Sequence, residues 1–317
     1  MISPDLISRL RVNPTTLKAL KDFGFEYIPD SDRQPPPPLP PTASIKGLMS
    51  PVRNQGSSGT CASFAALANF EFLIKNGANG ATPEPNIDLS EGHITHAVER
   101  IHGDCKEGLA FAEIAYYLKY NGCVEEIAWP YDQTIVCNPS PPNLAAVRRF
   151  YWTPGVRTID AFIFHREHDE AIKNMNLNLT GGIVATPIYW VDFVRQHIAQ
   201  ARRPVVVDVP VFWGSQGYEA GWGTGYVTMP TPTNLSDWLR DTANGGDVPG
   251  SAGWHAVAII GYDDSKRRFE FKNSWGDRWG SGGFGTLPYE YVTTYTRDAW
   301  NVSGGYSIGV GVPPYGI

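Results

Sequence analysis

The chain has 317 residues, of which 42% are hydrophobic and 12% aromatic, so it can bury a sizeable core and is neither a disordered nor a collagen-like chain. Its 26 basic and 32 acidic residues give a net charge of −6 without a run of like charges, a pattern that favours neither nucleic acid nor an anionic membrane surface as a partner. No segment approaches the roughly 18 apolar residues of a membrane helix, and Met1–Arg9 lacks a signal-peptide pattern. Secreted and cytoplasmic locations both fit.

The chain is expected to divide into three parts. Residues 1–33 form a small appendage with a short helical pattern that Asn13-Pro14 opens and Gly24 closes. Residues 34–47 form a linker, because the proline-rich run from 35 to 41 is stiff and extended. Residues 48–317 form the main domain, helical over about 48–150 and rich in strands over about 151–317.

The main domain is predicted to belong to the α+β class. Cys61–Lys75 is apolar nearly all round and ends before Asn76-Gly77, which predicts a buried central helix. Hydrophobic periodicity predicts further helices at about 90–100, 109–119 and 191–200, and strands at 205–209, 256–261 and 268–272. Residues 213–253 are rich in Gly, Trp, Thr and Pro and are expected to form a long ordered loop.

Cys61 is the strongest candidate for a catalytic residue. It follows a glycine-rich turn and begins the predicted central helix. The helix N-terminus offers unpaired N–H groups and partial positive charge, and both favour a thiolate over a thiol. Gln55, six residues upstream, can place an amide N–H beside the sulfur. Together with the Cys61 backbone N–H it would form a two-donor oxyanion hole.

Two further residues complete a catalytic set. His255 precedes the apolar run 256–260, so a strand gives its imidazole a rigid base. Asn273 directly follows the strand predicted at 268–272, and its carbonyl oxygen can accept from the imidazole and fix its tautomer. Trp275 can cover that hydrogen bond against water. The set predicts acyl transfer through a covalent cysteine intermediate.

These segments resemble the motifs of papain-like cysteine peptidases. The matching segments follow in that family's order: PVRNQGSSGTCASF at 51–64, LSE at 89–91, GDC at 103–105, PY at 130–131, HAVAIIGY at 255–262 and KNSWGDRWGSGGF at 272–284. The resemblance implies a helical lobe with Cys61 and a barrel-like lobe with His255 and Asn273. It also implies a cleft that binds an extended peptide, peptide hydrolysis through a thioester, and no cofactor or metal.

The chain departs from the family pattern in several places. Ala62 replaces the usual aromatic residue, and Ser58 replaces a cysteine, so one family disulfide of Cys105 is not formed. Pairing among Cys105, Cys123 and Cys137 stays open. The interval from Cys61 to His255 exceeds the roughly 130–150 residues typical of the family. The extra residues, at about 160–190 and 213–253, can line the cleft, so substrate preference does not follow from the resemblance.

The sequence leaves alternatives open for the function of the chain and for the roles of single residues. The enzyme is interpreted as an endopeptidase, but a transpeptidase or other acyltransferase would use the same thioester, and a non-catalytic binding protein would keep the scaffold alone.

His93, His96 and His102 lie at roughly helical spacing, but no carboxylate or cysteine completes a metal site. The tryptophans at 213, 222, 238 and 254 are interpreted as loop packing. Residues 1–33 are a candidate autoinhibitory segment across the cleft, anchored by Phe23, Phe25 and Tyr27.

Overall fold

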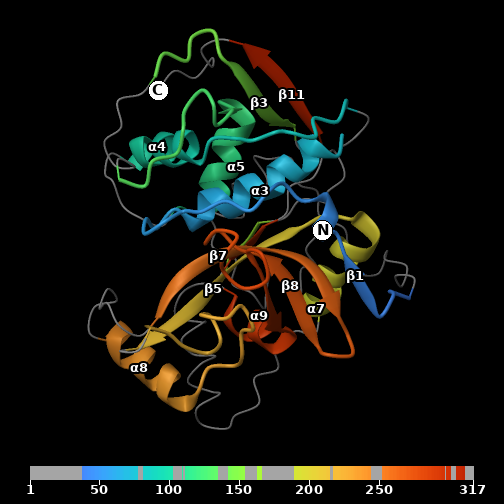
Figure 1. The fold of residues 1–317 in the computed structure, drawn as a ribbon, viewed down its shortest axis with the longest axis vertical. Helices are drawn as coiled ribbons and strands as arrows, with labels where there is room; N and C mark the ends of the chain where they lie inside the picture. The colour runs from blue at the N-terminus through green and yellow to red at the C-terminus, as the bar shows by residue number, and fades with distance from the viewer. Residues whose placement is uncertain are drawn as a thin grey trace.

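The computed structural model describes residues 38–77, 81–102, 109, 111–134, 142–153, 163–165, 189–214, 217–243, 252–296, 298–300 and 305–310. The chain folds into two lobes (Figure 1), one containing the helices α3–α5 and the other a large curved sheet. The helices of the first lobe are α3 (Cys61–Lys75), α4 (Glu91–His102) and α5 (Phe111–Tyr120). The predicted α+β two-lobe class is confirmed.

Helix α3 lies at the boundary between the lobes. Every residue from Ala62 to Ile74 is buried, which explains why the helix is apolar nearly all round. It contacts α4 and α5 on one side and strands β5 and β7 of the other lobe. The predicted bounds of this helix, Cys61–Lys75, are confirmed. A helix that is buried on all sides positions its first residue, Cys61, firmly relative to both lobes.

The sheet of the second lobe is antiparallel throughout, and its strands follow the order β4-β10-β5-β7-β8-β9, with β1 paired to β7 and β6 to β5. Their bounds are β4 Ile163–His165, β10 Asp298–Trp300, β5 Val205–Gly214, β7 Ala252–Asp263, β8 Arg268–Lys272, β9 Phe284–Pro288, β1 Thr42–Ser44 and β6 Gly217–Tyr218. The other segments of this part are the short 3-10 helix η2 (Lys46–Leu48), α7 (Tyr189–Gln196), its π-helical continuation η4 (His197–Ala201), α8 (Pro232–Ala243) and α9 (Tyr289–Tyr295). The long strands β5 and β7 pair with each other and form the centre of this sheet.

Both ends of the described chain cross to the opposite lobe. Strand β11 (Gly305–Val310) pairs with β3 (Arg148–Thr153), which in turn pairs with β2 (Cys123–Val124) beside the helices. At the other end β1 pairs with β7 of the large sheet. The proposed domain boundaries stay predictions, but this exchange means that no single cut near residue 150 separates the lobes.

The described part of the proline-rich segment is docked on the sheet. The hydroxyl of Tyr262 donates to the carbonyl of Pro40 at 2.7 Å, and the backbone N–H of Asp264 donates to that of Pro41 at 2.9 Å. Residues 42–44 then continue as strand β1. Residues 1–37, including the expected appendage, lie outside the described residues.

The expectation of a loop at 213–253 is wrong, because helix α8 lies within it. The hydroxyl of Thr231 accepts from the backbone N–H of Asn234 at 3.1 Å, while the Thr231 N–H donates to the Asn234 side chain at 2.9 Å. This reciprocal cap, followed by Pro232 at the first helical position, begins the helix. Trp238 then packs edge-on against Phe212 and Trp254. The high Gly and Pro content of residues 213–253 favoured the prediction of a loop over the local signals for a helix start at Thr231 and Pro232.

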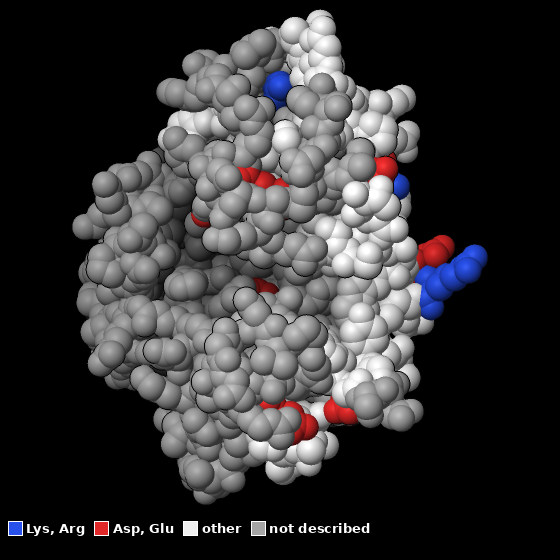
Figure 2. Space-filling view, turned by 90° about the vertical axis from the view of Figure 1, so that its left-hand side faces the viewer, with Lys and Arg blue, Asp and Glu red and all other residues white. Residues whose placement is uncertain are grey.

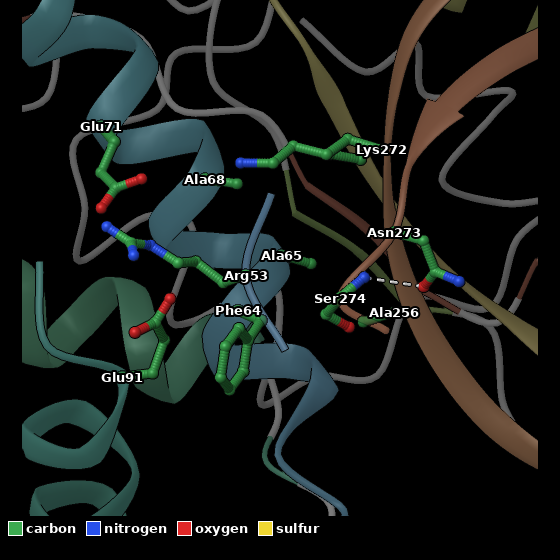
Figure 3. Close-up of a pocket in the computed structure, with 11 residues that line it drawn as sticks. Arg53, Phe64, Ala65, Ala68, Glu71, Glu91, Ala256, Lys272, Asn273 and Ser274 are labelled. Carbon is green, nitrogen blue, oxygen red and sulfur yellow. Dashed lines mark hydrogen bonds between the residues drawn. The ribbon is translucent and has the colours of Figure 1, made fainter. Parts of the chain in front are cut away.

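A small pocket lies between the lobes behind the first turns of α3 (Figure 3), and charged side chains line it. Glu71 of α3 accepts from the Leu89 N–H at 2.7 Å, and the ammonium of Lys272 from β8 donates to Ser50 at 3.0 Å. Burial lowers the pKa of Lys272 to about 8, and Glu71 and Glu91 oppose that shift. Burial raises the pKa of Glu71 and Glu91. Acidic groups of the helical lobe and the amine of Lys272 from the sheet therefore face one another where all of them are buried.

The surface agrees with the absence of charge runs in the sequence. On the face shown in Figure 2, the Lys and Arg side chains of the described residues lie singly rather than in a patch. No helix in the described parts of the chain is long and apolar enough to cross a membrane.

A buried histidine lies in the helical lobe. His93 packs against the rings of Tyr117 and Trp129, with ring centroids 5.7 and 5.5 Å away. Its Nε2 lies 3.3 Å from Nη1 of Arg149, which can only donate, so Nε2 accepts. Burial, with Arg149 and His96, lowers the pKa of His93 to about 3. The adjacent guanidinium disfavours a metal cation at this histidine.

We predict that His93 makes folding sensitive to acid. Between pH 6.5 and 3, His93 binds a proton in the unfolded state but not in the folded state. The free energy of unfolding therefore falls as the pH is lowered through this window. In His93→Gln this contribution is removed, while an acceptor for Arg149 remains. Chemical unfolding at several pH values should show the wild type losing up to about 1.4 kcal/mol per pH unit relative to the variant. Parallel curves for the two proteins would contradict the assignment.

Candidate active site

A cleft of about 780 Å³ brings most of the predicted site residues together. Cys61 contributes from the start of α3, and His255 from β7. Gln55 and Trp275 line the same cleft. Asn273 does not line it but lies behind His255, where it is only 3% exposed. All five predicted residues are therefore placed at one site, although residues 55–61 and 255–275 are far apart in sequence.

The local structure presents Cys61 at a helix N-terminus. It is the first residue of α3, and it is partly exposed whereas the rest of the helix up to Ile74 is buried. Its own N–H is one of the four that have no acceptor within the helix. The preceding turn requires Gly56, whose φ is +64° and where a Cβ would overlap the side chain of Gln133. The turn and the buried helix together aim the thiol into the cleft.

Asn273 fixes the tautomer of His255. The Nε2 atom of His255 lies 2.7 Å from Oδ1 of Asn273. Because a carbonyl oxygen only accepts, Nε2 carries the proton and Nδ1 keeps a lone pair. Burial lowers the pKa of His255 to about 4, against the opposing effect of the Asn273 hydrogen bond. Beside a neutral thiol the imidazole is therefore itself neutral at pH 7, in the form that accepts a proton.

Aromatic rings enclose the bond between His255 and Asn273. Trp275 stacks on the imidazole with centroids 4.6 Å apart, and Trp222 meets it edge-on at 6.0 Å. Trp222 is fully buried, and its indole N–H donates to the hydroxyl of Tyr291 at 3.2 Å. Tyr218, about half exposed, stacks on Trp275 at 4.8 Å. Exclusion of water by these rings strengthens the polar contact that they cover.

Gln55 is held by residues on both sides of the cleft. Its Nε2 donates to the carbonyl of Ser58 at 2.7 Å, and its Oε1 accepts from the hydroxyl of Ser274 at 2.5 Å. The Ser274 N–H donates in turn to Oδ1 of Asn273 at 2.8 Å. A continuous set of hydrogen bonds thus joins Gln55 to His255. An amide nitrogen carries two hydrogens, so Gln55 retains one for an acceptor other than Ser58.

Sequence reasoning missed several residues of the site. Ser274 belongs to the Asn-Ser-Trp segment, but nothing in the segment indicated that its hydroxyl bonds Gln55, 219 positions away. The ring of Trp222, which the sequence assigns to loop packing, also covers the candidate base. Tyr218 and Asp208 line the site from β6 and β5, and only the pairing of the strands brings them there.

The structure narrows the disulfide question. Cys123 is a fully buried free thiol whose sulfur donates to the carbonyls of Ser90 and Val124 at 3.5 and 3.3 Å. Burial raises its pKa well above the usual value, which makes it unreactive. Pairings that involve Cys123 are therefore wrong, while Cys105 and Cys137 lie outside the described residues.

Comparison with known proteins supports this assignment. Residues 42–161 and 242–296 match the model of the papain family of cysteine proteases. Among curated relatives, oryzain gamma chain of Oryza sativa subsp. japonica is 25% identical over 243 residues, which are 75% of this chain and 51% of that protein. An uncharacterized peptidase C1-like protein of Acanthamoeba polyphaga mimivirus is 45% identical over 212 residues, 60% of this chain and 62% of the relative. The chain spans about half the length of several of the curated relatives it matches.

Solved structures share the fold. Xylellain, a cysteine protease from Xylella fastidiosa, matches with a TM-score of 0.55 at 21% identity and covers 88% of this chain and 96% of its own. A Carica candamarcensis cysteine protease in complex with E-64 matches with a TM-score of 0.50 at 21% identity, covering 84% and 100%. Procathepsin L 3 of Tenebrio molitor larval midgut matches with a TM-score of 0.50 at 17% identity, covering 90% and 75%. The family match extends over more than half of the chain and includes the segments of Cys61, His255 and Asn273, so the chain belongs to the papain family of cysteine proteases.

Proposed function

We propose that this chain is a cysteine peptidase that hydrolyses peptide bonds through a thioester. The observation that carries the proposal is the placement of Cys61 and His255 in one cleft, with Asn273 bonded behind the imidazole at 2.7 Å. A helix N-terminus activates the thiol, and a neutral imidazole of fixed tautomer offers Nδ1 as the proton acceptor. No cofactor is needed for this chemistry.

Each step has a residue to perform it. The sulfur of Cys61 attacks the carbonyl carbon while Nδ1 of His255 takes the thiol proton. The charge that develops on the carbonyl oxygen is met by the Cys61 N–H and the second amide hydrogen of Gln55. Collapse of the tetrahedral intermediate breaks the C–N bond, and His255 returns the proton to the leaving amine. Water, deprotonated by His255, then attacks the thioester carbon. The C–S bond breaks, the acid leaves, and His255 returns the proton to the sulfur of Cys61.

An endopeptidase fits the cleft better than a carboxypeptidase. Among the described residues that line the cleft, none is a lysine or arginine able to hold a substrate's terminal carboxylate. The transpeptidase alternative differs only in the acceptor of the thioester, so it needs a test by product analysis rather than by structure.

The first experiment measures intact mass after incubation with an epoxysuccinyl inhibitor of thiol peptidases. We expect one adduct on the wild type and none on Cys61→Ala, because only an activated, accessible Cys61 opens the epoxide. Cleavage of a casein substrate should disappear in the same variant. An adduct on Cys61→Ala, or cleavage by it, would refute the assignment. Amide products formed on addition of an amine would favour the transpeptidase instead.

We further predict that Ser274 positions the oxyanion donor. Ser274→Ala frees the Gln55 amide to rotate, so kcat should fall by roughly 10-fold, less than the roughly 100-fold or greater loss expected for Gln55→Ala. Alkylation of Cys61 by iodoacetamide builds no oxyanion, and its rate should change much less in both variants. Ser236→Ala, an exposed serine of α8, is the matched control. Equal losses in hydrolysis and alkylation would indicate a general structural effect.

We also propose that residues 1–33 inhibit the enzyme by lying across the cleft, with Phe23, Phe25 and Tyr27 as anchors. One of the proteins of similar fold, procathepsin L 3, is a proenzyme. The proline-rich stretch joins residues 1–33 to β1, which is docked on the sheet.

Deletion of residues 1–37 should raise kcat/KM toward small substrates. The cut preserves the carbonyls of Pro40 and Pro41, which accept from Tyr262 and Asp264, so the sheet keeps its contacts. Replacement of the three aromatic anchors by alanine in the full chain should raise activity in the same direction. Unchanged kinetics in both proteins would rule out inhibition by this segment.

A further inference from the structure

A loop of the helical lobe holds the turn that carries both candidate oxyanion donors. We call residues 55–60 the nucleophile turn. It begins at Gln55, whose side chain is one candidate donor, and it ends at Thr60, whose carbonyl group forms a peptide with the N–H of Cys61, the other donor. Residues 131–133, which are 71 to 76 positions further along the chain than their partners, contact this turn.

The hydroxyl of Tyr131 bridges the two ends of the nucleophile turn. It donates to the backbone carbonyl of Gln55 at 2.9 Å. Because a hydroxyl has one hydrogen, Thr60 is the donor in the 2.8 Å contact between its Oγ1 and the same Tyr131 oxygen. Gln55 is 6% and Thr60 2% exposed, so water has little access to replace these bonds. A single oxygen atom thus joins the residues that supply the two candidate donors.

Gln133 holds the middle of the same turn. Its Oε1 accepts from the backbone N–H of Ser57 at 2.9 Å. Its carboxamide fills the space beside Gly56 that a Cβ would need, with Oε1 1.4 Å from that position. Glycine at position 56 therefore permits the close approach of Gln133 as well as the left-handed backbone. Ser58 stands in this turn where the family has a cysteine, so no disulfide from position 58 fixes it.

We propose that Tyr131 and Gln133 are positioning residues for the oxyanion donors, and that their hydrogen bonds fix the nucleophile turn in place of a covalent link at position 58. The inference rests on the proposed peptidase function. The sheet lobe holds Gln55 through its N–H, which donates to the carbonyl of Ser274 at 2.8 Å. Tyr131 then sets where Gln55 lies relative to the first turn of α3. Because a misplacement of about 1 Å can cost about 100-fold in rate, a slight loosening of this turn is measurable in catalysis.

The other contacts of Tyr131 allow its hydroxyl to be tested separately from its ring. The ring packs edge-on against Phe64 of α3, with centroids 4.9 Å apart and an angle of 89° between the planes. The backbone N–H of Tyr131 donates to Oε1 of Glu126 at 2.7 Å. Tyr131→Phe keeps both contacts and removes the bridge alone.

The test compares Tyr131→Phe with the wild type in the full chain, on the fluorogenic peptide amide that the wild type cleaves fastest in a mixed library. Active enzyme is counted by titration of Cys61 with the epoxysuccinyl inhibitor. We expect kcat to fall by about 3- to 10-fold with little change in KM, because the donors act in the transition state. Alkylation by iodoacetamide forms no oxyanion and should keep its rate. In a Gln55→Ala background the same substitution should lower kcat less, because one donor is already gone.

Gln133 supplies a second, independent pair of variants. Gln133→Leu should lower kcat in the same direction, and Gln133→Glu should retain most of it, because a carboxylate still accepts from the Ser57 N–H. Tyr306→Phe is the matched control. It removes a tyrosine hydroxyl that donates to the backbone carbonyl of Thr82 at 2.6 Å, from a residue that does not line the cleft, and its kcat should stay that of the wild type.

Several results would overturn the inference. They are an unchanged kcat in Tyr131→Phe, equal losses in hydrolysis and alkylation, and equal losses of kcat in Tyr131→Phe and Tyr306→Phe. If Tyr131→Phe does not fold in a thermal melt, the difference in kcat between Gln133→Leu and Gln133→Glu decides. A wild type that neither reacts with the inhibitor nor cleaves peptides would instead overturn the peptidase function.

Discussion

The site depends on a short stretch of backbone that joins the two lobes. The Gln55 N–H donates to the carbonyl of Ser274 at 2.8 Å, and the Gly276 N–H donates to that of Arg53 at 3.0 Å. Between these bonds Asn54 and Trp275 form an isolated antiparallel bridge. The candidate oxyanion donor and the segment that orients the base are therefore parts of one paired structure. A shift of one lobe would break these bonds before it could separate the catalytic residues.

Packing and buried charge hold that pairing in place. Helix α3 is buried against both lobes, so its N-terminus, and with it Cys61, has little freedom to move. Behind the site, Glu71 and Lys272 line a small pocket and are both buried, and such a pair is costly unless each group has partners. Hydrogen bonds from Leu89 to Glu71 and from Lys272 to Ser50 supply them. This requirement for partners favours one relative placement of the lobes.

The candidate catalytic residues and part of the cleft wall come from different parts of the chain. Cys61, His255 and Asn273 lie in the segments shared with the family, whereas β5, β6 and α8 lie wholly or largely between them. Trp238 of α8 packs on Trp254 of β7, next to His255 in sequence, so the segment between the matched parts is anchored on the strand that carries the base. Strand β5 then contributes Val211 and Trp213 to the lining of the cleft. Such an arrangement lets the binding wall change while the catalytic geometry remains.

The sequence by itself determined the candidate residues of the chemistry and most of the regular elements. The apolar run of α3 has the bounds that its pattern predicted, because burial on every side leaves a continuous hydrophobic signal. The motifs around Cys61, His255 and Asn273 predicted residues that the fold brings together, because each proposed role demands a particular side chain. Helix α8 escaped prediction, since its cap at Thr231 is a local signal within a segment rich in glycine and proline.

Only the tertiary structure decided which distant residues support those roles. Ser274 meets Gln55, Trp222 covers His255, and Asp208 enters the cleft because β5 pairs with β7 in one register. The crossing of β11 to the helical lobe is equally invisible in the sequence. Contacts of this kind depend on strand register and on the packing of the lobes, and a linear pattern carries no record of either.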